Sequence, residues 1–221
     1  MKEGFLIIDK PSGITSHDVV NFMRRKFRMR RIGHAGTLDP LATGVLVILL
    51  GKATKLFNEF SAFDKAYEAT LRLGLKTTTA DINGQTIKES DCTQIIQEEV
   101  QKAFERLTGT IQQIPPMVSA VKFKGKRLYQ LARSGIEIAR EPRTVTIKEL
   151  RLVDFNLPDV RLFVRCSKGT YIRTIAEDVG EALGCGGCIS QIKRTQVGSF
   201  LIDEAVSLED VNESYIRHWK R

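Results

Sequence analysis

The sequence Arg31-Ile32-Gly33-His34-Ala35-Gly36-Thr37-Leu38-Asp39-Pro40-Leu41-Ala42-Thr43-Gly44 runs directly into the apolar stretch Val45-Leu46-Val47-Ile48-Leu49-Leu50. The apolar stretch predicts a buried strand, and the glycines and proline before it predict an irregular loop. A strand holds the end of such a loop rigidly, so the loop is a favourable place for binding or catalytic residues.

Within that loop, Asp39 is the only acidic residue between Asp18 and Glu59, and six of the eight residues 24–31 are basic. Pro40 restricts Asp39 to an extended backbone, and the nearby glycines permit tight turns or close approach of a ligand. A carboxylate beside a cation suits nucleophilic attack at an electrophilic carbon. An Asp-Pro pair also occurs in simple turns, where the carboxylate only accepts local backbone hydrogen bonds. We interpret Asp39 as a nucleophile because of its glycine-rich, basic surroundings.

A candidate partner cation is Arg173, in the segment Lys168-Gly169-Thr170-Tyr171-Ile172-Arg173 at the start of a predicted helix. An arginine within a few ångströms would keep a carboxylate ionised and orient it. An ordinary surface ion pair with Glu177, four residues later, is an equally good interpretation of Arg173 from the residues alone.

Two tyrosines and a histidine are candidate substrate contacts. Tyr67 in a predicted strand and Tyr171 at a helix start suit stacking on a base removed from its helix, although core packing is the more common use of tyrosine. His34 suits a phosphate or base contact, or it is an ordinary polar loop residue. The three histidines show no metal-ligand spacing, and we expect no metal or other cofactor. Cys185-Gly186-Gly187-Cys188 lacks a second pair, so we interpret it as a turn.

The charge of the chain favours a polyanionic partner. Its 221 residues carry a net charge of +8, with a pI of about 9.4, and basic surfaces of this kind bind nucleic acid. No apolar run is long enough for a membrane span, and the N-terminus lacks the features of a signal peptide, so we expect a cytoplasmic protein with no membrane contact. The four cysteines are too few and unevenly spaced for a disulfide scaffold.

Strands are predicted at residues 4–9, 45–50, 65–73, 144–147, 160–166 and 189–197, and an Asn83-Gly84 turn is expected. Helices are predicted after a Thr15 or Ser16 cap, at residues 53–60, 94–107 and 171–183, and from Ser207. The irregular mixture favours an α+β fold built on a mixed or antiparallel sheet. A basic excursion from the core is expected around residues 119–143.

The motifs are similar, in order, to those of the TruB-type tRNA pseudouridine synthases. Residues 33–44 closely resemble the active-site motif of that family, and Lys65-Ala66-Tyr67 with Asp81 resembles its second motif. Pro115-Pro116 and the basic residues that follow resemble its inserted RNA-binding segment. Residues 166–173 resemble its third motif, and Ile192-Lys193-Arg194 resembles a later Leu-Arg-Arg motif, with Ile and Lys as departures. The resemblance extends over about residues 4–205.

The resemblance implies that the protein isomerises uridine 55 in the T-loop of tRNA, with Asp39 as nucleophile and Arg173 as its partner. It implies that Tyr67 stacks on the flipped uracil and aids proton transfer, and that His34, Tyr171 and Ile192 contact substrate. It leaves open which atom Asp39 attacks. We expect backbone contacts with the T-stem-loop from nine basic residues: Arg24, Arg25, Arg31, Lys122, Lys126, Arg133, Arg143, Lys193 and Arg194.

The implied fold is an α+β pseudouridine synthase domain with a central mixed, largely antiparallel sheet flanked by helices. We expect this domain to cover residues 1–205, with an RNA-gripping insertion at about residues 115–145. Residues 206–221 would form a short tail with no PUA domain, and the protein would be a monomer. The alternative function is a non-catalytic tRNA-binding or RNA-folding module that uses the same basic surface.

Overall fold

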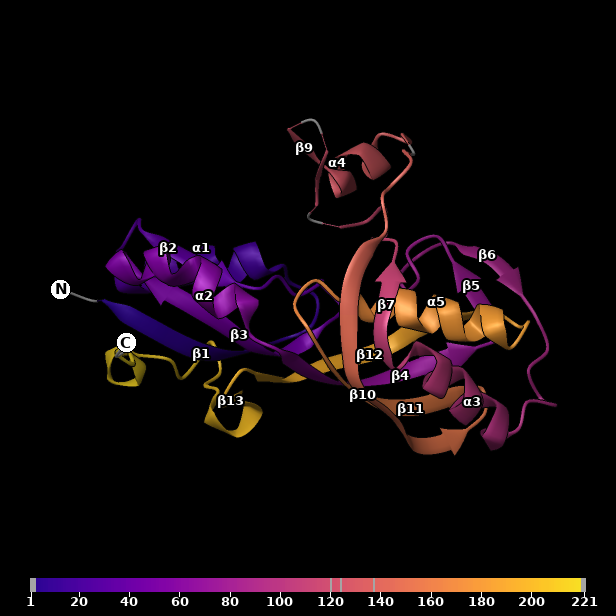
Figure 1. The fold of residues 1–221 in the computed structure, drawn as a ribbon. Helices are drawn as coiled ribbons and strands as arrows, with labels where there is room; N and C mark the ends of the chain where they lie inside the picture. The colour runs from indigo at the N-terminus through magenta and orange to yellow at the C-terminus, as the bar shows by residue number, and fades with distance from the viewer. Residues whose placement is uncertain (1–2, 120, 124, 137, 220–221) are drawn as a thin grey trace. The chain divides into compact units, whose positions relative to one another are not determined.

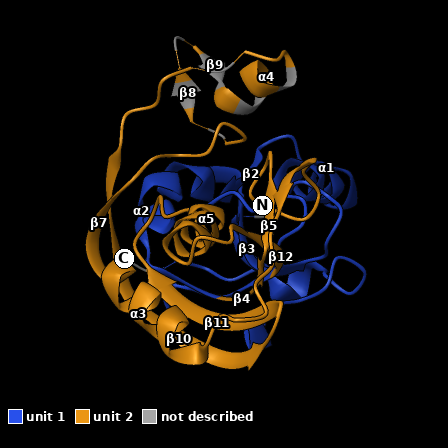
Figure 2. Ribbon diagram, turned by 90° about the vertical axis from the view of Figure 1, so that its right-hand side faces the viewer, with its two compact units in different colours: residues 1–67, 192–221 blue, residues 68–191 orange. Residues whose placement is uncertain are grey.

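The chain forms two compact units in a computed structural model that describes residues 3–119, 121–123, 125–136 and 138–219. Unit 1 contains residues 1–67 and 192–221, and unit 2 contains residues 68–191 (Figure 2). Two strands, β4 (Lys65–Leu73) and β12 (Gly187–Val197), include the points at which the chain passes from one unit to the other.

The central strand of unit 1 is β3 (Thr43–Leu50), which confirms the strand expected from the apolar run. Its residues 44–50 pair antiparallel with β1 (Gly4–Lys10), and its last four residues pair antiparallel with β2 (Ile32–Ala35). It also pairs parallel with β12, whose end pairs antiparallel with the short β13 (Phe200–Leu201). Residues 44–50 of β3 are all buried, so both faces of the strand are covered, and such a strand requires an uninterrupted apolar sequence.

Helix α1 (Ser16–Phe27) begins where the sequence predicts. Thr15 is the N-cap and forms a capping box with Asp18, an arrangement that satisfies backbone donors at both residues. The expected helix at residues 53–60 is instead a 3₁₀-helix, η1 (Gly51–Leu56), followed by α2 (Phe57–Ala62). The helix predicted from Ser207 was wrong: Ser207 caps a turn at Asp210, and η2 (Ile202–Glu204) and η3 (Glu213–Tyr215) are the short 3₁₀ segments in this region.

An aromatic cluster closes one face of the unit 1 sheet. The ring of Phe60 lies 5.2 Å from that of Phe5, 5.9 Å from that of Phe200 and 4.8 Å from that of Trp219. Phe60 is fully buried, and aromatic pairs at such spacings stabilise a core beyond their buried area alone. Trp219 therefore helps to cover the strands that position the Asp39 loop.

The strands of unit 2 follow the order β4, β11 (Asp159–Cys166), β10 (Arg143–Asn156) and β7 (Gly109–Gln113). β10 pairs antiparallel with both β11 and β7. It is far longer than the four residues predicted for it, because pairing with β11 carries it as far as Asn156. Figure 1 shows this long strand beside α5 (Ile172–Ala182) and α3 (Gln97–Leu107).

Helix α3 starts at Gln97, three residues later than predicted, and Ile96 is its N-cap. Ile96 is 54% exposed, so it does not belong to the buried face of the helix. The hairpin of β5 (Leu75–Thr77) and β6 (Thr86–Glu89) contains the expected Asn83-Gly84 turn. Between β7 and β10 the structure describes β8 (Lys122–Phe123), β9 (Lys126–Arg127) and α4 (Leu128–Arg133). The elements confirm an α+β architecture with a mixed, largely antiparallel sheet and flanking helices.

Candidate active site

The loop that carries Asp39 joins β2 to β3 in unit 1, and its backbone is fastened to α1. The side chain of Ser16 accepts a 2.8 Å hydrogen bond from the backbone N–H of Leu38 and donates a 3.1 Å bond to the carbonyl oxygen of Leu38. Leu38 is buried and Asp39 is half-buried. The backbone N–H and the carbonyl oxygen of Leu38, the residue before Asp39, are therefore both hydrogen-bonded to Ser16.

Arg194 holds the same loop from β12. Its Nη2 donates to the carbonyl oxygen of Gly36 (3.0 Å), its Nη1 to that of Thr37 (3.4 Å) and its Nε to that of Val45 (2.7 Å). The side chain is 1% exposed. The planar guanidinium can reach three carbonyl oxygens at once because its donors form a fixed fork. Arg194 therefore connects the two ends of the Asp39 loop.

This finding corrects the expectation that Arg194 contacts the RNA backbone. A side chain that is 1% exposed and donates three hydrogen bonds within the protein is not placed to reach a phosphate. Its neighbour Lys193 is exposed, as the alternation of side chains along a strand requires.

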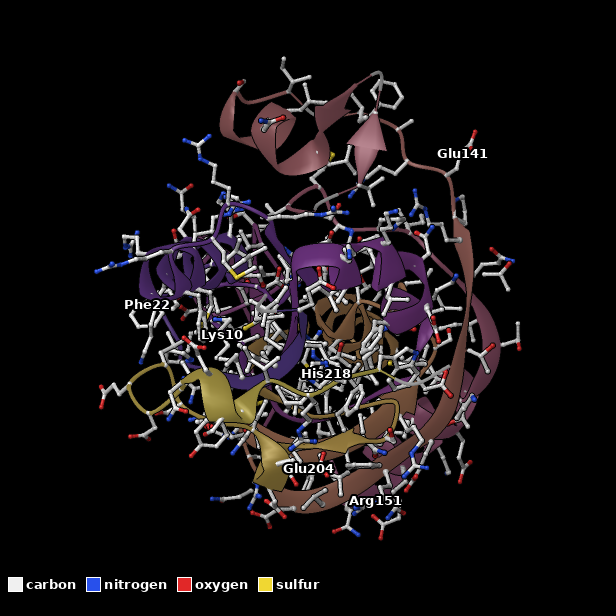
Figure 3. The ribbon with its side chains drawn as sticks, turned by 90° about the vertical axis from the view of Figure 1, so that its left-hand side faces the viewer. Lys10, Phe22, Glu141, Arg151, Glu204 and His218 are labelled. Carbon is white, nitrogen blue, oxygen red and sulfur yellow. The ribbon has the colours of Figure 1, made fainter. Side chains whose placement is uncertain are left out.

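Lys10, at the end of β1 and labelled in Figure 3, is a second buried cation, and it contacts the loop at Pro40. Its Nζ donates to the carbonyl oxygens of Ile14 (2.7 Å), Pro11 (2.8 Å) and Pro40 (3.3 Å). Burial lowers the pKa of Lys10 to about 8; the nearby Asp39 carboxylate opposes this fall, and Arg194 adds to it. The carboxylate of Asp39 therefore lies within the electrostatic reach of the buried Lys10 ammonium.

The other candidate residues of unit 1 lie on adjoining strands. His34 is half-buried in β2, opposite Ile48 of β3. Ile192 is half-buried in β12, and its carbonyl oxygen accepts a 3.5 Å hydrogen bond from Thr43. Tyr67 lies in β4 and is 8% exposed.

In unit 2, Arg173 occupies the first turn of α5 and is 4% exposed. Its Nη1 donates to the carbonyl oxygen of Thr79 and its Nη2 to that of Val118, both at 2.8 Å. The Asp81 carboxylate lies 3.8 Å from Nη1. Arg173 is therefore buried and hydrogen-bonded to backbone carbonyl oxygens. The helical spacing alone had allowed an exposed ion pair with Glu177 instead.

Asp81 is itself fixed by its neighbours. Its Oδ1 accepts hydrogen bonds from the Thr79 hydroxyl (2.7 Å) and the backbone N–H of Asn83 (3.1 Å). Tyr171 is half-buried at the N-cap of α5, where its backbone N–H and carbonyl oxygen both bond to the side chain of Gln113. The start of α5, with Arg173, is therefore anchored from two directions.

The remaining basic candidates differ in what the structure shows of them. The side chains of Arg25, Arg31, Arg143 and Lys193 are exposed. Arg24 is half-buried and donates to the Asn21 side chain and to the carbonyl oxygen of Ile32, so part of its guanidinium serves the fold. The side chains of three further candidates lie outside the described part of the chain, which gives only their backbone in β8, β9 and α4: Lys122, Lys126 and Arg133.

Reasoning from sequence did not predict three structural features around the candidate residues: the hydrogen bonds of Lys10 to the loop, the burial of Arg194, and the support of Arg173 by Asp81. The sequence offers one signal for Lys10, since a charged residue ends an apolar strand directly before a proline turn. The four cysteines are buried and form no disulfide. No helix among the described residues has the length and apolar character needed to cross a membrane.

Solved structures define the class of the fold. The chain superposes on a chain of a Cbf5–Nop10–Gar1 complex with a TM-score of 0.74 and 29% identity, covering 95% of this chain and 53% of that one. For a chain of an archaeal box H/ACA sRNP Nop10–Cbf5 complex, the TM-score is 0.70 and the identity 25%, covering 97% and 54%. The chain thus spans about half the length of these solved chains, and its fold is that of the pseudouridine synthases.

Sequence relatives identify the family. Residues 24–172 match the family described as "TruB family pseudouridylate synthase (N terminal domain)", and residues 173–221 match "tRNA pseudouridylate synthase B C-terminal domain". The tRNA pseudouridine synthase B of Clostridium tetani (strain Massachusetts / E88) is 46% identical over 98% of this chain and 75% of that protein. That of Moorella thermoacetica is 46% identical over 96% and 70%. The chain therefore belongs to the TruB family of pseudouridine synthases, which are isomerases.

Proposed function

We propose that this protein converts uridine 55 in the T-loop of tRNA to pseudouridine, with Asp39 as the nucleophile. The main support for the proposal is the set of hydrogen bonds that hold the backbone of the Asp39 loop. They come from the side chains of Ser16, Lys10 and Arg194, all within one unit. A loop held at this many points presents its carboxylate in one geometry, which nucleophilic catalysis requires.

The isomerisation breaks the ribose C1′–N1 bond of uridine and joins C1′ to C5 of the same base. The C5 proton leaves, and N1 gains a proton, so the reaction consumes no redox equivalent. A carboxylate, a cation to orient it, a stacking ring and contacts with the RNA are sufficient for this chemistry. Asp39 attacks the ribose C1′ or adds to uracil C6 as a nucleophile, and the route that the proposal sets aside is abstraction of the 2′ proton by Asp39 as a base.

We assign the remaining roles by the resemblance of the motifs. Arg173 pairs with Asp39 during the reaction, and its support by Asp81 would keep the guanidinium in place. Tyr67 stacks on the flipped uracil and aids proton transfer at C5, a use consistent with an aromatic ring on a strand. His34, Tyr171 and Ile192 contact the substrate nucleotide and its neighbours.

We further propose that the exposed basic residues hold the T-stem through its phosphates, together with the insertion at about residues 115–145. Arg25, Arg31, Arg143 and Lys193 have exposed side chains that suit this role, because guanidinium and ammonium groups pair with the phosphate oxygens of nucleic-acid backbones. The catalytic domain would cover residues 1–205, and the protein would act as a monomer in the cytoplasm on tRNA.

Treating an unmodified tRNA transcript with the purified protein tests the proposal. We expect one pseudouridine, at position 55, when the product is mapped by mass-shift labelling. A protein that binds the transcript and forms no pseudouridine would instead be an RNA-binding module. Modification at other uridines with position 55 untouched would contradict the proposed substrate.

A further inference from the structure

Gln113, the last residue of β7, is a buried residue whose side-chain amide bonds to the backbone of Tyr171. It is 2% exposed, and its strand lies beside α5 in Figure 1. Its Oε1 accepts a 2.7 Å hydrogen bond from the N–H of Tyr171, and its Nε2 donates a 3.1 Å bond to the carbonyl oxygen of Tyr171. One side chain therefore pairs with both backbone groups of a candidate substrate contact.

This pair of hydrogen bonds limits the side chains that can replace Gln113. A backbone N–H only donates and a carbonyl oxygen only accepts, so their common partner must offer an acceptor and a donor next to each other. The carboxamide of glutamine has this arrangement. An ionised glutamate lacks the donor, and methionine lacks a strong group of either kind.

The contact supports the beginning of α5. Tyr171 is the N-cap of this helix, and its own side chain forms no capping hydrogen bond. The first backbone N–H groups of a helix have no partner within the helix and need one from outside. Arg173 follows two residues later, in the first turn. A displacement of the Tyr171 backbone would therefore move Arg173 as well.

The residues that follow Gln113 also bond to Arg173 directly. The Nη2 of Arg173 donates a 2.8 Å hydrogen bond to the carbonyl oxygen of Val118. Segment 113–118 therefore contacts the start of α5 twice, at the Tyr171 backbone and at the Arg173 guanidinium.

Segment 113–118 is also the path by which the chain enters the expected RNA-binding insertion. Gln113 is the direct cross-strand partner of Arg143, so the chain leaves the sheet and returns to it at one residue pair. Shortly before the return, Arg140 donates a 3.0 Å hydrogen bond from Nη1 to the carbonyl oxygen of Pro115. The base of the insertion and the start of α5 therefore belong to one hydrogen-bonded network within unit 2.

We propose that Gln113 is a positioning residue for pseudouridine formation. It fixes the backbone of Tyr171 and, through the first turn of α5, the direction of the Arg173 guanidinium. The inference rests on the proposed function, because Tyr171 and Arg173 take their roles from it. A direct contact with RNA fits less well, because Gln113 is 2% exposed and both its polar side-chain atoms bond to Tyr171.

The main test compares Gln113→Met with Gln112→Met on a T-stem-loop RNA. Gln112 is the matched control, because it lies on the same strand but is exposed and bonds to the Thr144 side chain. We expect Gln113→Met to lower the single-turnover rate at saturating RNA about tenfold or more, with RNA affinity within about threefold of wild type. Gln112→Met should keep both within about twofold. A folded Gln113→Met variant that reacts at the wild-type rate would show that Gln113 serves the fold alone, and would overturn the inference.

Gln113→Glu is a second variant that keeps the test decisive if the methionine variant does not fold. It preserves the size of the side chain and the acceptor for the Tyr171 N–H, and it removes only the donor to the carbonyl oxygen. We expect a loss of single-turnover rate of about threefold or more at neutral pH, with unchanged RNA affinity. A wild-type rate for this variant would also count against the inference.

Hydrogen exchange of the Tyr171 amide, followed by NMR, provides a readout that does not require activity. Exchange should become about tenfold or more faster in Gln113→Met and stay near the wild-type rate in Gln112→Met. If wild type forms no pseudouridine, the proposed function fails, and this exchange still decides whether Gln113 fixes Tyr171. If wild type is active and Gln113→Met matches it in both rate and exchange, the inference alone fails.

Discussion

Arg194→Met should destabilise the protein and slow its reaction through the same structural cause. The guanidinium is 1% exposed and pairs with the carbonyl oxygens of Gly36, Thr37 and Val45. Each buried polar group that loses its partner costs about 1–3 kcal/mol. Removing a buried charge together with its bonds relieves some desolvation cost as well. We therefore expect a net loss of about 3–5 kcal/mol in the free energy of unfolding.

The assay is urea denaturation at pH 7.5, paired with the single-turnover rate of pseudouridine formation. Arg194→Lys keeps the charge but not the planar fork, so we expect about half the loss of stability. Lys193→Met is the matched control, because its side chain is exposed and one residue away; its stability should stay within about 0.5 kcal/mol of wild type. If Arg194→Met keeps wild-type stability and loses only RNA affinity, Arg194 is a phosphate contact and our assignment is wrong.

Three further substitutions test separate parts of the structure. Gly44→Ala should lower the free energy of unfolding, measured by urea denaturation, by about 3 kcal/mol or more, because at φ +97 its Cβ would lie 2.2 Å from a backbone oxygen. The control Gly13→Ala has a similar φ of +87 but lies in open space, so its loss should be only about 1–2 kcal/mol. Equal losses for the two variants would refute the close approach at Gly44. Asp81→Asn should lower the single-turnover rate of pseudouridine formation about tenfold or more, because it removes the carboxylate that lies 3.8 Å from Arg173. Its RNA affinity should stay within about twofold of wild type. An unchanged rate would contradict the supporting role of Asp81. Asp178→Asn should stabilise the protein by about 1 kcal/mol at pH 7.5, because solvent screens a partly exposed carboxylate and reduces the cost of its charge.

The sign of the Asp178 prediction follows from proton binding. The pKa of Asp178 is raised to about 6 in the folded protein, mainly by burial, from its usual 3.8. The folded state therefore takes up this proton at a higher pH than the unfolded state, and stability from this group rises as pH falls from about 6 towards 4. The advantage of Asp178→Asn should disappear over that interval. An advantage that is constant between pH 7.5 and pH 4 would show that the ionised carboxylate carries no cost.

Local patterns were sufficient to predict the strands at the centre of unit 1. β1 and β3 appeared as apolar runs because each is buried on both faces, and the Thr15 cap was visible because capping depends on neighbouring residues. The length of β10 was not visible. Its second half alternates weakly and is held as a strand by pairing with β11, which lies later in the chain.

For the candidate site, too, the sequence predicted some features and did not predict others. Motif order indicated Asp39 and Arg173 as functional residues, but it did not reveal how they are held. The burial of Arg194 follows from the parallel pairing of β12 with β3, where Arg194 lies opposite Gly44. That pairing joins strands about 150 residues apart in the sequence, and no local pattern near residue 194 indicates it. For this reason a charged residue expected at the surface became part of the loop's support.

A comparison of wild type with Asp39→Asn decides whether Asp39 performs the chemistry. Wild type and Asp39→Asn would be assayed on the same T-stem-loop RNA, with single-turnover pseudouridine formation and RNA affinity measured together. We expect a rate at least about a thousandfold lower for Asp39→Asn, with affinity within about threefold of wild type. Pseudouridine formation by Asp39→Asn at the wild-type rate would contradict it.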